Sequence, residues 1–542
     1  MISTPAPAPR PAPPRRRRRR LAIALTLVPV LLIAGCAAIA LAGPMIPGLL
    51  SAQKVDTVGN VDFSRPLAIP PLAPSRVDAD GTRVFELEAQ DGYSEFRSGQ
   101  QTATRGYNGA HLGPTLVAAR GEKVRTEITN RLEDPTTLHW HGMHLPAAMD
   151  GGPHQPIAPG GHAAPGWTLD QPAATLWYHP HPHDDTEDQV ARGLAGLFLV
   201  TDAEEAALDL PRTYGLDDIP VLVQDVDLDE SAVLSDDNRG FVGALGTELL
   251  VNGTFAPYLD VSTAAVRLRL LNASTARTYN FGFDDERTFA MVASDGGLLS
   301  TPHTTDAIRL SPGERAEIIV SLSPGERPVL RSTEQDLGMP DDLAGRNGGA
   351  DRFDVLELRA GPELVPASLV PDSLASIEPL RESDAVATRS FTLDGFTING
   401  ETMDMDRIDE VVTAGSTETW VVRNGMVMPH NFHVHDVQFQ VASVGGDDPP
   451  PELAGWKDTV YLAPQVEYRL VMRFGTDGDR DSPYMYHCHL LWHEDAGMMG
   501  QFLVVEPGDT VEPGEHDSTD DHTDTPPGGY GPRQTEGTDH EH

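Results

Sequence analysis

The chain has 542 residues, enough for about three domains of ordinary size, and 39% of them are hydrophobic, which is enough for packed cores. Its formal net charge is −41 at pH 7. So acidic a surface repels nucleic acid and attracts cations, which excludes nucleic acid as a partner.

Residues 1–50 have the pattern of an export signal or a membrane anchor. Six consecutive arginines at positions 15–20 precede an uncharged apolar segment, as in a signal sequence or signal anchor. Residues 21–42 are long enough to span a bilayer, so we favour an anchor with its arginines inside. A twin-arginine export signal and a lipoprotein site at Cys36, in IAGC, are the alternatives. All three place the rest of the chain outside the cytoplasm.

The remainder of the chain reads as short strands between turns. Residues 51–80 are rich in proline and glycine and are predicted to be a linker. Residues 81–202 contain runs such as RVFELEA and GLFLVTD separated by turn residues, as in a sandwich of antiparallel strands. Residues 203–384 form a second β-rich region without paired histidines, and residues 385–507 form a third. Residues 508–542 hold ten acids, four histidines and almost nothing apolar, and we predict a disordered tail.

The segment YMYHCHLLWHEDAGMM, near the end of the third region, carries ligands for two metal sites. If YMYHCH is a β-strand, its side chains alternate, so His487 and His489 point to one face and Cys488 to the other. His493 and Met498 follow with enough chain to return to Cys488. A thiolate, imidazoles and a weak thioether form a blue-copper electron-transfer centre, and that set needs one more histidine.

Histidines at strand spacing recur along the chain. Within MPHNFHVH, His430 stands three residues before a pair, so it is left to complete the Cys488 site. Four H-x-H pairs each share one face of a strand: His139 and His141, His179 and His181, His433 and His435, His487 and His489. Eight imidazoles exceed the about four ligands of one zinc ion and suit a copper cluster. Two pairs come from the first region and two from the third, so we expect these regions to pack face to face around the cluster.

In this order, HWHG, HPH, HxxHxH and HCHxxxHxxxxM resemble the four ligand blocks of the multicopper oxidases. The closest resemblance is to the bacterial copper-efflux oxidases, which are laccase-like. GYNGAHLGPTL, DQPAAT, VARGLAGLFLV, ASDGGLL and AGWKDTV extend the resemblance over roughly residues 65–507. It implies an all-β fold of three cupredoxin-like Greek-key β-sandwich domains, of which the middle one holds no copper.

The resemblance also implies four copper ions per chain and the ligands of each. The type 1 copper would be bound by His430, Cys488, His493 and Met498, and the type 2 copper by His139 and His433. The type 3 pair would be bound by the other six histidines: His141, His179, His181, His435, His487 and His489. Electrons from a small reductant would pass through Cys488 to its two neighbours, and O₂ would be reduced to water at the cluster.

Reduction of dioxygen consumes protons, so acids must reach the buried cluster. Asp150 in AMDGG and Glu494, which follows His493, match the proton-relay positions of the family. For Asp150 the alternative is a turn-forming aspartate before two glycines, and a purely structural role is also the alternative for Glu494. We predict that both residues relay protons.

The substrate is expected to be Cu(I), a phenol or an aromatic amine. Met428 matches a methionine of the Cu(I) site in copper-efflux oxidases. Met426 stands where those enzymes have an acid, so it either binds Cu(I) as a soft ligand or packs beside the site. Their methionine-rich insert is missing between about residues 335 and 400, so the mononuclear copper is expected to be more exposed. We expect a monomer.

Two other classes of function remain as alternatives. HPHPHDD superficially resembles the histidine-rich loop of metallo-β-lactamase-like zinc hydrolases, but that interpretation leaves HCHLLWH unexplained. A non-catalytic copper-binding relative would keep the fold and lose ligands, whereas all twelve expected ligand positions are filled here.

Overall fold

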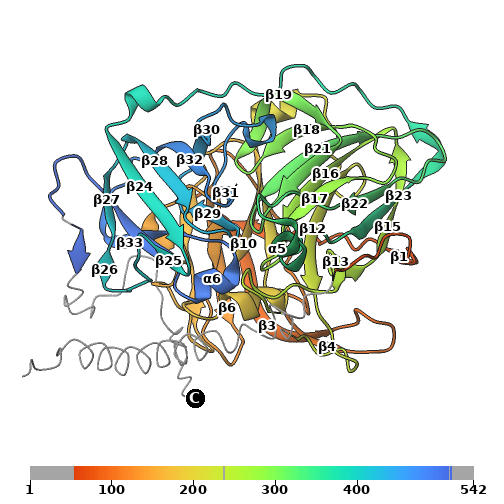
Figure 1. The fold of residues 1–542 in the computed structure, drawn as a ribbon, viewed down its shortest axis with the longest axis horizontal. Coiled ribbons are helices and arrows are strands. Elements are labelled where there is room, and N and C mark those ends of the chain that lie inside the picture. The colour runs from red at the N-terminus through yellow and green to blue at the C-terminus, as the bar shows by residue number, and fades with distance from the viewer. Residues whose placement is uncertain (1–53, 236–238, 512, 516–542) are drawn as a thin grey trace, which may run out of the picture. The chain divides into compact units, whose positions relative to one another are not determined.

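The computed structural model describes residues 54–235, 239–511 and 513–515, which fold mostly into β-strands (Figure 1). The predicted all-β architecture is therefore confirmed. The predicted signal or anchor segment, with Cys36, lies outside the described residues, as do residues 516–542 of the predicted tail. Among the residues described, no helix has both the length and the apolar character needed to cross a membrane.

The first sandwich consists of a six-stranded and a four-stranded sheet. The six-stranded sheet has the order β2-β3-β6-β8, with β4 paired to β3 and β9 paired to β6: β2 Ser75–Val77, β3 Arg83–Ser94, β4 Thr102–Tyr107, β6 Lys123–Asn130, β8 His162–Ala163 and β9 Gly166–Thr168. The other sheet has the order β5-β11-β10-β7: β5 Leu116–Ala119, β11 Gly196–Thr201, β10 Ala174–His179 and β7 His139–His141. Alternation in β3 buries Phe85 and Leu87 and exposes Glu86, as the pleat of a strand requires.

The middle sandwich consists of a six-stranded and a seven-stranded sheet. The first has the order β1 Arg65–Pro66, β15 Pro257–Thr263, β23 Phe353–Val365, β22 Val329–Ser332, β17 Tyr279–Phe283 and β20 Ala307–Leu310. The second has the order β14 Thr254–Phe255, β13 Glu248–Val251, β12 Asp218–Val226, β16 Ala265–Asn272, β21 Arg315–Ser321, β18 Phe289–Ser294 and β19 Gly297–Thr305. Within residues 51–80, predicted as a linker, β1 pairs with β15 and β2 pairs with β3.

The third sandwich consists of two five-stranded sheets. One has the order β25 Thr397–Ile398, β24 Ala387–Asp394, β28 Thr417–Asn424, β32 Glu467–Arg473 and β30 Phe439–Val444. The other has the order β27 Glu410–Thr413, β34 Met499–Val505, β33 Asp479–His487, β29 His430–Val434 and β31 Thr459–Leu462. A two-stranded ribbon joins β26 Arg407–Ile408 to β35 Gly514–Glu515, so the start of the predicted tail adds a strand through its main chain.

Helices are few and short among the described residues. The α-helices are α3 Thr186–Ala191, α4 Ala203–Ala207, α5 Asp341–Arg346 and α6 Leu491–Asp495, and the 3-10 helices are η1 Ala147–Met149, η2 Glu382–Asp384 and η3 Pro451–Leu453. Figure 1 shows α6 beside β25 of the third sandwich and α5 beside strands of the middle one. Both helices flank the candidate site described below.

A buried ionic network joins the first and middle sandwiches. The carboxylate of Glu317, in β21, accepts hydrogen bonds from Arg267 at 2.7 Å, from Arg269 at 2.8 Å and from the Thr175 hydroxyl of β10 at 2.6 Å. Burial alone would raise the pKa of Glu317, but the two guanidinium groups outweigh burial and lower it to about 2. The folded state therefore holds Glu317 ionised.

Replacing this carboxylate should cost stability in a pH-dependent way. Glu317→Gln removes the anion that Arg267 and Arg269 share, and because Glu205 and Asp218 still pair with these arginines, the loss should be about 1.5 to 3 kcal/mol, as for hydrogen bonds to charged groups. Because the pKa falls from 4.5 to about 2 on folding, the wild-type advantage is complete above a pH of about 4.5 and is lost as the pH falls toward 2. Unfolding midpoints of the metal-free wild type and variant, measured across this range, check this prediction. A difference that stays constant down to the lowest pH would contradict it.

Candidate metal centre

Strand pairing brings the histidine pairs together within each sandwich. In the first sandwich, His139 of β7 lies in register opposite His179 of β10. In the third, His433 of β29 lies in register opposite His487 of β33. Trp140, between two histidines, packs into the apolar core of the first sandwich, so alternation along β7 sends both imidazoles away from that core. The two sandwiches therefore present equivalent arrays of four imidazoles.

The two arrays meet and form three buried groups. In each group, ring nitrogens of three histidines lie within 4.8 Å of one another. The groups are His139, His141 and His433; His141, His179 and His489; and His181, His435 and His487. Every one of these side chains is at most 1% exposed. The structure thus gathers all eight predicted cluster histidines, and each group takes members from both sandwiches.

Hydrogen bonds fix which nitrogen of each ring faces the group. Nδ1 of His139, His179 and His433 lies 3.1, 2.8 and 2.8 Å from a main-chain carbonyl oxygen, so it carries the proton and Nε2 carries the lone pair. His141 is reversed, because its Nε2 lies 3.0 Å from Asp458 Oδ1. In the described part of the chain, none of the inward nitrogens of these four rings has a hydrogen-bond partner.

The third group provides the clearest evidence that a cation fits here. Nδ1 of His435 lies 2.7 Å from Asp150 Oδ2, and Nδ1 of His487 lies 3.1 Å from the Cys488 carbonyl oxygen. Burial, followed by nearby imidazoles, lowers the pKa of both rings well below the usual value, so both are neutral. Their Nε2 lone pairs therefore face each other at 3.2 Å. Such a contact is repulsive unless a cation shares the lone pairs, and neutral imidazole is a common metal ligand.

Cys488 lies in a separate group with two other histidines. Its Sγ is 3.7 Å from His430 Nδ1 and 3.5 Å from His493 Nδ1. His493 Nε2 donates to the Phe241 carbonyl oxygen at 2.7 Å, which leaves the lone pair on Nδ1. Burial raises the pKa of Cys488 to about 12, so a cation is needed to hold the thiolate there. Met498 is buried in the same apolar cluster, and its carbonyl oxygen accepts from Cys488 N.

Residues 487–489 connect the two sites. Strand β33 ends at His487, yet the alternation expected for HCH persists, because the His487 and His489 rings lie 5.5 Å apart while Cys488 belongs to the other group. The side chain of Asn431 fixes this arrangement. Its Oδ1 accepts from His489 N at 2.5 Å and from Cys488 Sγ at 3.5 Å. Cys488 is joined to each of the two histidines by a single peptide bond.

Asp150 and Glu494 both contact the histidine cluster. Asp150 Oδ2 lies 2.7 Å from His435 Nδ1, and its Oδ1 lies 3.4 Å from His139 Nδ1. Glu494, in α6, lies between two imidazoles of the third group. Its Oε1 is 3.3 Å from His181 Nδ1, and its Oε2 is 3.2 Å from His487 Nδ1. Burial raises the pKa of Glu494 well above its usual value, so this carboxyl can hold a proton beside the cluster.

The two candidate methionines lie in different environments. Met426 Sδ accepts from Gly395 N at 2.7 Å. Met428 Sδ lies 3.7 Å from Asn347 Nδ2, and Met339 Sδ lies 4.0 Å from the same amide. Met339 was not found by the sequence analysis. The only signal for it was its position at the start of the region where the methionine-rich insert is missing.

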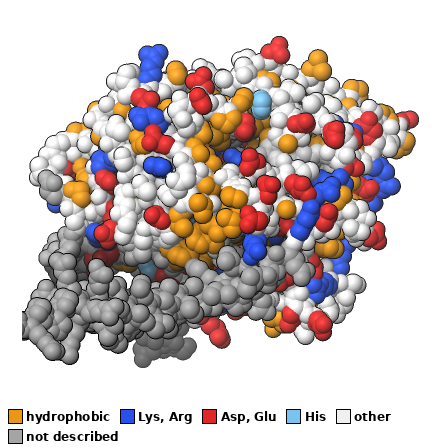
Figure 2. Space-filling view, viewed as in Figure 1, with side chains coloured by type: hydrophobic (Ala, Val, Ile, Leu, Met, Phe, Trp, Pro, Cys, Tyr) orange, Lys and Arg blue, Asp and Glu red, His pale blue; other side chains and the backbone are white. Residues whose placement is uncertain are grey.

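The Cys488 site is covered on its outer side, contrary to the expectation of a more exposed copper. His430 and His493 are both 0% exposed. The rings of Phe241 and Phe396 are stacked with centroids 5.5 Å apart, and each lies edge-on to His493 at 5.1 Å. Figure 2 shows hydrophobic side chains gathered over α6 on this face. Aromatic rings thus cover this side of the site, and one of them, Phe241, comes from the middle region.

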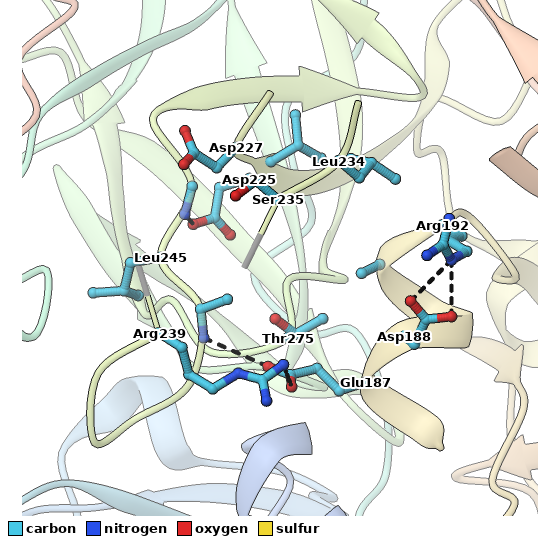
Figure 3. Close-up of a pocket in the computed structure, with 14 residues that line it drawn as sticks. Glu187, Asp188, Arg192, Asp225, Asp227, Leu234, Ser235, Arg239, Leu245 and Thr275 are labelled. Atoms are coloured by element: carbon cyan, nitrogen blue, oxygen red, sulfur yellow. Dashed lines mark hydrogen bonds and ion pairs between the residues drawn. The ribbon is translucent and has the colours of Figure 1, made fainter. Parts of the chain in front are cut away.

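A pocket of about 210 Å³ lies beside this cover (Figure 3). Arg239 forms an ion pair with Glu187 there at 2.8 Å and also lies over the Trp492 ring of α6, 4.4 Å from its centroid. The segment that leads to Phe241 is thereby held against α6. None of the metal-binding groups found among the described residues includes a carboxylate of this pocket.

Sequence models of the multicopper oxidases match residues 88–205, 251–327 and 378–508. The chain belongs to the multicopper oxidase family. A multicopper oxidase of Staphylococcus haemolyticus is 34% identical over 445 residues, covering 81% of this chain and 92% of the relative. The cell division protein FtsP of Escherichia coli is 35% identical over 477 residues, covering 86% and 97%.

Solved structures agree with this assignment. A laccase-like multicopper oxidase CueO from Ochrobactrum sp., described as active toward lignin model compounds, has a TM-score of 0.74 and 35% identity, covering 81% of this chain and all of that one. The resemblance inferred from the four ligand blocks is therefore confirmed, and with it copper binding and the cupredoxin-like fold. The zinc-hydrolase alternative is not supported.

Copper should stabilise this protein strongly. Each sandwich supplies half of the cluster histidines, so bound ions link the two sandwiches and relieve the lone-pair contacts. We expect the unfolding midpoint of the metal-free chain to rise on copper loading and to stay unchanged with Mg²⁺, which prefers oxygen ligands. Copper that binds at full occupancy without raising the midpoint would contradict this assignment.

Proposed function

We propose that the chain is an exported oxidase that couples one-electron oxidation of a small reductant to the reduction of O₂ to water. The observation that carries this proposal is the HCH segment, in which Cys488 and its two neighbours belong to separate metal-binding groups. The amino-terminal segment would deliver the enzyme outside the cytoplasm, attached through residues 21–42 or a lipidated Cys36.

The ligand assignment follows the groups of the structure. We assign the type 1 copper to His430, Cys488, His493 and Met498. The type 2 copper is assigned to His139 and His433, which share a group. The other six histidines fall into two groups of three, which suits a type 3 pair: His141, His179 and His489, and His181, His435 and His487. Four copper ions per chain would fill these positions.

When bound, the four copper ions would collect single electrons at Cys488 and supply four together to dioxygen. The protein contributes the path and the protons. Residues 487–489 join the two sites covalently, and Asn431 holds both ends of this path. Asp150 and Glu494 each touch two imidazoles of the cluster, which suits them to pass protons toward it.

The cover over the type 1 site favours Cu(I) over phenols and aromatic amines as the reductant. His493 Nε2 is taken by the Phe241 carbonyl oxygen, and the aromatic cover closes that side. Within the described ranges of the chain, the buried His430 Nε2 has no hydrogen-bond partner, unlike His493 Nε2. Electrons would therefore enter through the His430 ring. Met428, two residues before His430, and Met339 offer soft sulfur ligands that suit Cu(I).

Two substitutions should each shift substrate preference from Cu(I) toward phenols, one by raising phenol oxidation and the other by lowering Cu(I) oxidation. Phe396→Ala removes half of the cover and should raise kcat/KM for 2,6-dimethoxyphenol by about tenfold. Met428→Leu keeps the volume but removes the sulfur, and should lower kcat/KM for Cu(I) by a similar factor. About tenfold corresponds to 1.4 kcal/mol, the size expected of one lost contact in the transition state.

The Met426 sulfur already accepts a hydrogen bond from Gly395 N. Met426→Leu is therefore the matched control for the Cu(I) rate of Met428→Leu. It should change the Cu(I) rate less than Met428→Leu does. Equal losses in the two methionine variants, or no gain of phenol oxidation in Phe396→Ala, would reject this substrate assignment.

Replacement of the thiol should separate the two metal sites. Cys488→Ser should remove the blue colour and the oxidase activity, because serine lacks the thiolate. The variant should still fold and bind close to three copper ions, because the cluster histidines remain. Copper content, visible absorption and the unfolding midpoint check these expectations. Oxidase rates equal to those of the wild type in Cys488→Ser would contradict the proposed electron path.

A non-catalytic copper-binding role is the second candidate, because FtsP, a cell division protein by name, is 35% identical to this chain. The complete ligand set favours the oxidase. Oxygen consumption with Cu(I) or a phenol distinguishes the two functions, since a binding protein would take up copper without turning over dioxygen.

A further inference from the structure

The middle sandwich reaches the cluster although it supplies no histidine to it. Residues 311–314 connect β20 to β21 and lie against the first sandwich and the third. A Cβ atom built on Gly313, whose φ is +86°, would lie 3.2 Å from His141 Cε1 and 3.2 Å from His489 Cδ2. Asn431 Nδ2 donates to the Pro312 carbonyl oxygen at 2.9 Å. This loop therefore forms a wall of the group that contains His141 and His489.

Arg315, the residue after this loop, touches all three sandwiches. It is 0% exposed. Its Nε donates to the Thr175 carbonyl oxygen of the first sandwich at 3.0 Å. Its Nη1 and Nη2 donate to Asp458 Oδ1 and Oδ2 of the third sandwich, both at 2.7 Å. A guanidinium fork that meets both oxygens of a carboxylate fixes the carboxylate plane as well as its position.

Asp458 in turn fixes the ring of His141. Its Oδ1 lies 3.0 Å from His141 Nε2 and also accepts from the Thr459 hydroxyl at 2.9 Å. An ionised carboxylate only accepts hydrogen bonds, so His141 must carry its proton on Nε2 and face the cluster with Nδ1. His139, His179 and His433 do the opposite, because a main-chain carbonyl oxygen binds their Nδ1.

The loop around Arg315 is itself rigid. Asp295 Oδ1 accepts from Arg315 N at 2.8 Å. Lys457 Nζ lies 2.9 Å from Asp295 Oδ2 and 2.8 Å from Glu314 Oε1. These side chains are all buried, and each carboxylate is paired with the Lys457 ammonium. Arg315 is thus held through its main-chain N–H as well as through its guanidinium.

We propose that Arg315 is a positioning residue for the copper cluster: through Asp458 it holds His141 in the reversed orientation that presents Nδ1 to the metal. The proposal rests on the proposed function, since it concerns one ligand of the assigned type 3 pair. A main-chain carbonyl cannot be lost by substitution, whereas the orientation of His141 depends on two side chains, Asp458 and Thr459, which each lie 3.0 Å from its Nε2, and Asp458 also accepts from the Thr459 hydroxyl. The middle sandwich would thereby determine whether the cluster of the other two is complete.

The competing explanation is that Arg315 and Asp458 only hold sandwiches together. Arg269 supplies a matched control for that role. It is also buried, it forms a two-pronged pair with Asp218 at 2.7 and 2.9 Å, and it donates to Thr175 Oγ1 across the same interface. Its carboxylate partners Asp218 and Glu317 bind arginines and Thr175, whereas Asp458, the partner of Arg315, contacts the cluster histidine His141.

The test compares Arg315→Lys with Arg269→Lys in copper-loaded protein. Lysine keeps the charge and loses the fork. Both variants should lower the unfolding midpoint. Only Arg315→Lys should also change the electron paramagnetic resonance signal of the cluster, reduce its copper content, and lower kcat about 10- to 100-fold, the effect of losing an outer partner of a metal ligand. The blue absorption of the Cys488 site should persist in both.

Asp458→Asn is a second variant in case Arg315→Lys fails to fold. Its amide can donate to His141 Nε2 and so permit the opposite tautomer, which should produce the same loss of cluster copper. Cluster signals and copper content equal to wild type in Arg315→Lys or Asp458→Asn would overturn the proposal. If the wild type itself binds copper without a cluster signal, the proposed function fails instead, and the two failures are thus distinguishable.

Discussion

The structure depends on one electrostatic constraint, the burial of neutral imidazoles with their lone pairs facing one another. His435 Nε2 and His487 Nε2 lie 3.2 Å apart, and both rings carry their proton on Nδ1, which faces Asp150 or the Cys488 carbonyl oxygen. Burial keeps these rings neutral, so protons do not relieve the contacts. A shared cation does. The first and third sandwiches therefore fit together best around metal ions, and the fold and the site are stabilised by the same interaction.

Because side chains alternate along an extended strand, residues 487–489 contribute to two neighbouring sites. Cys488 points into the core of the third sandwich, where burial raises the pKa of its thiol to about 12, while His487 and His489 point toward the first sandwich. A thiol and two imidazoles on consecutive residues thus belong to different candidate metal groups. Asn431 Oδ1 accepts from both residues of this segment that it contacts, Cys488 and His489, and so supports the covalent connection between the two groups.

Much of the site could be predicted from the sequence, because its ligands follow strand spacing. His139 and His141, or His433 and His435, share a face for local reasons alone. The features that were not predictable depend on segments far apart in the chain. Phe241, from the middle region, covers the Cys488 site, Met339 joins Met428 around Asn347, and Arg315 reaches His141 through Asp458. No periodicity signals such contacts, and the expected exposure of the type 1 site was wrong for this reason.

The account predicts that electrons pass from the Cys488 site to the histidine cluster and on to dioxygen, and stopped-flow absorption tests this most directly. The fully reduced, copper-loaded chain would be mixed with substoichiometric O₂ while the blue absorption of the Cys488 site is followed. The blue colour should return within the mixing experiment, with four electrons consumed per O₂. A Cys488 site that stays colourless in the presence of O₂, in protein with a full complement of copper, would contradict the account.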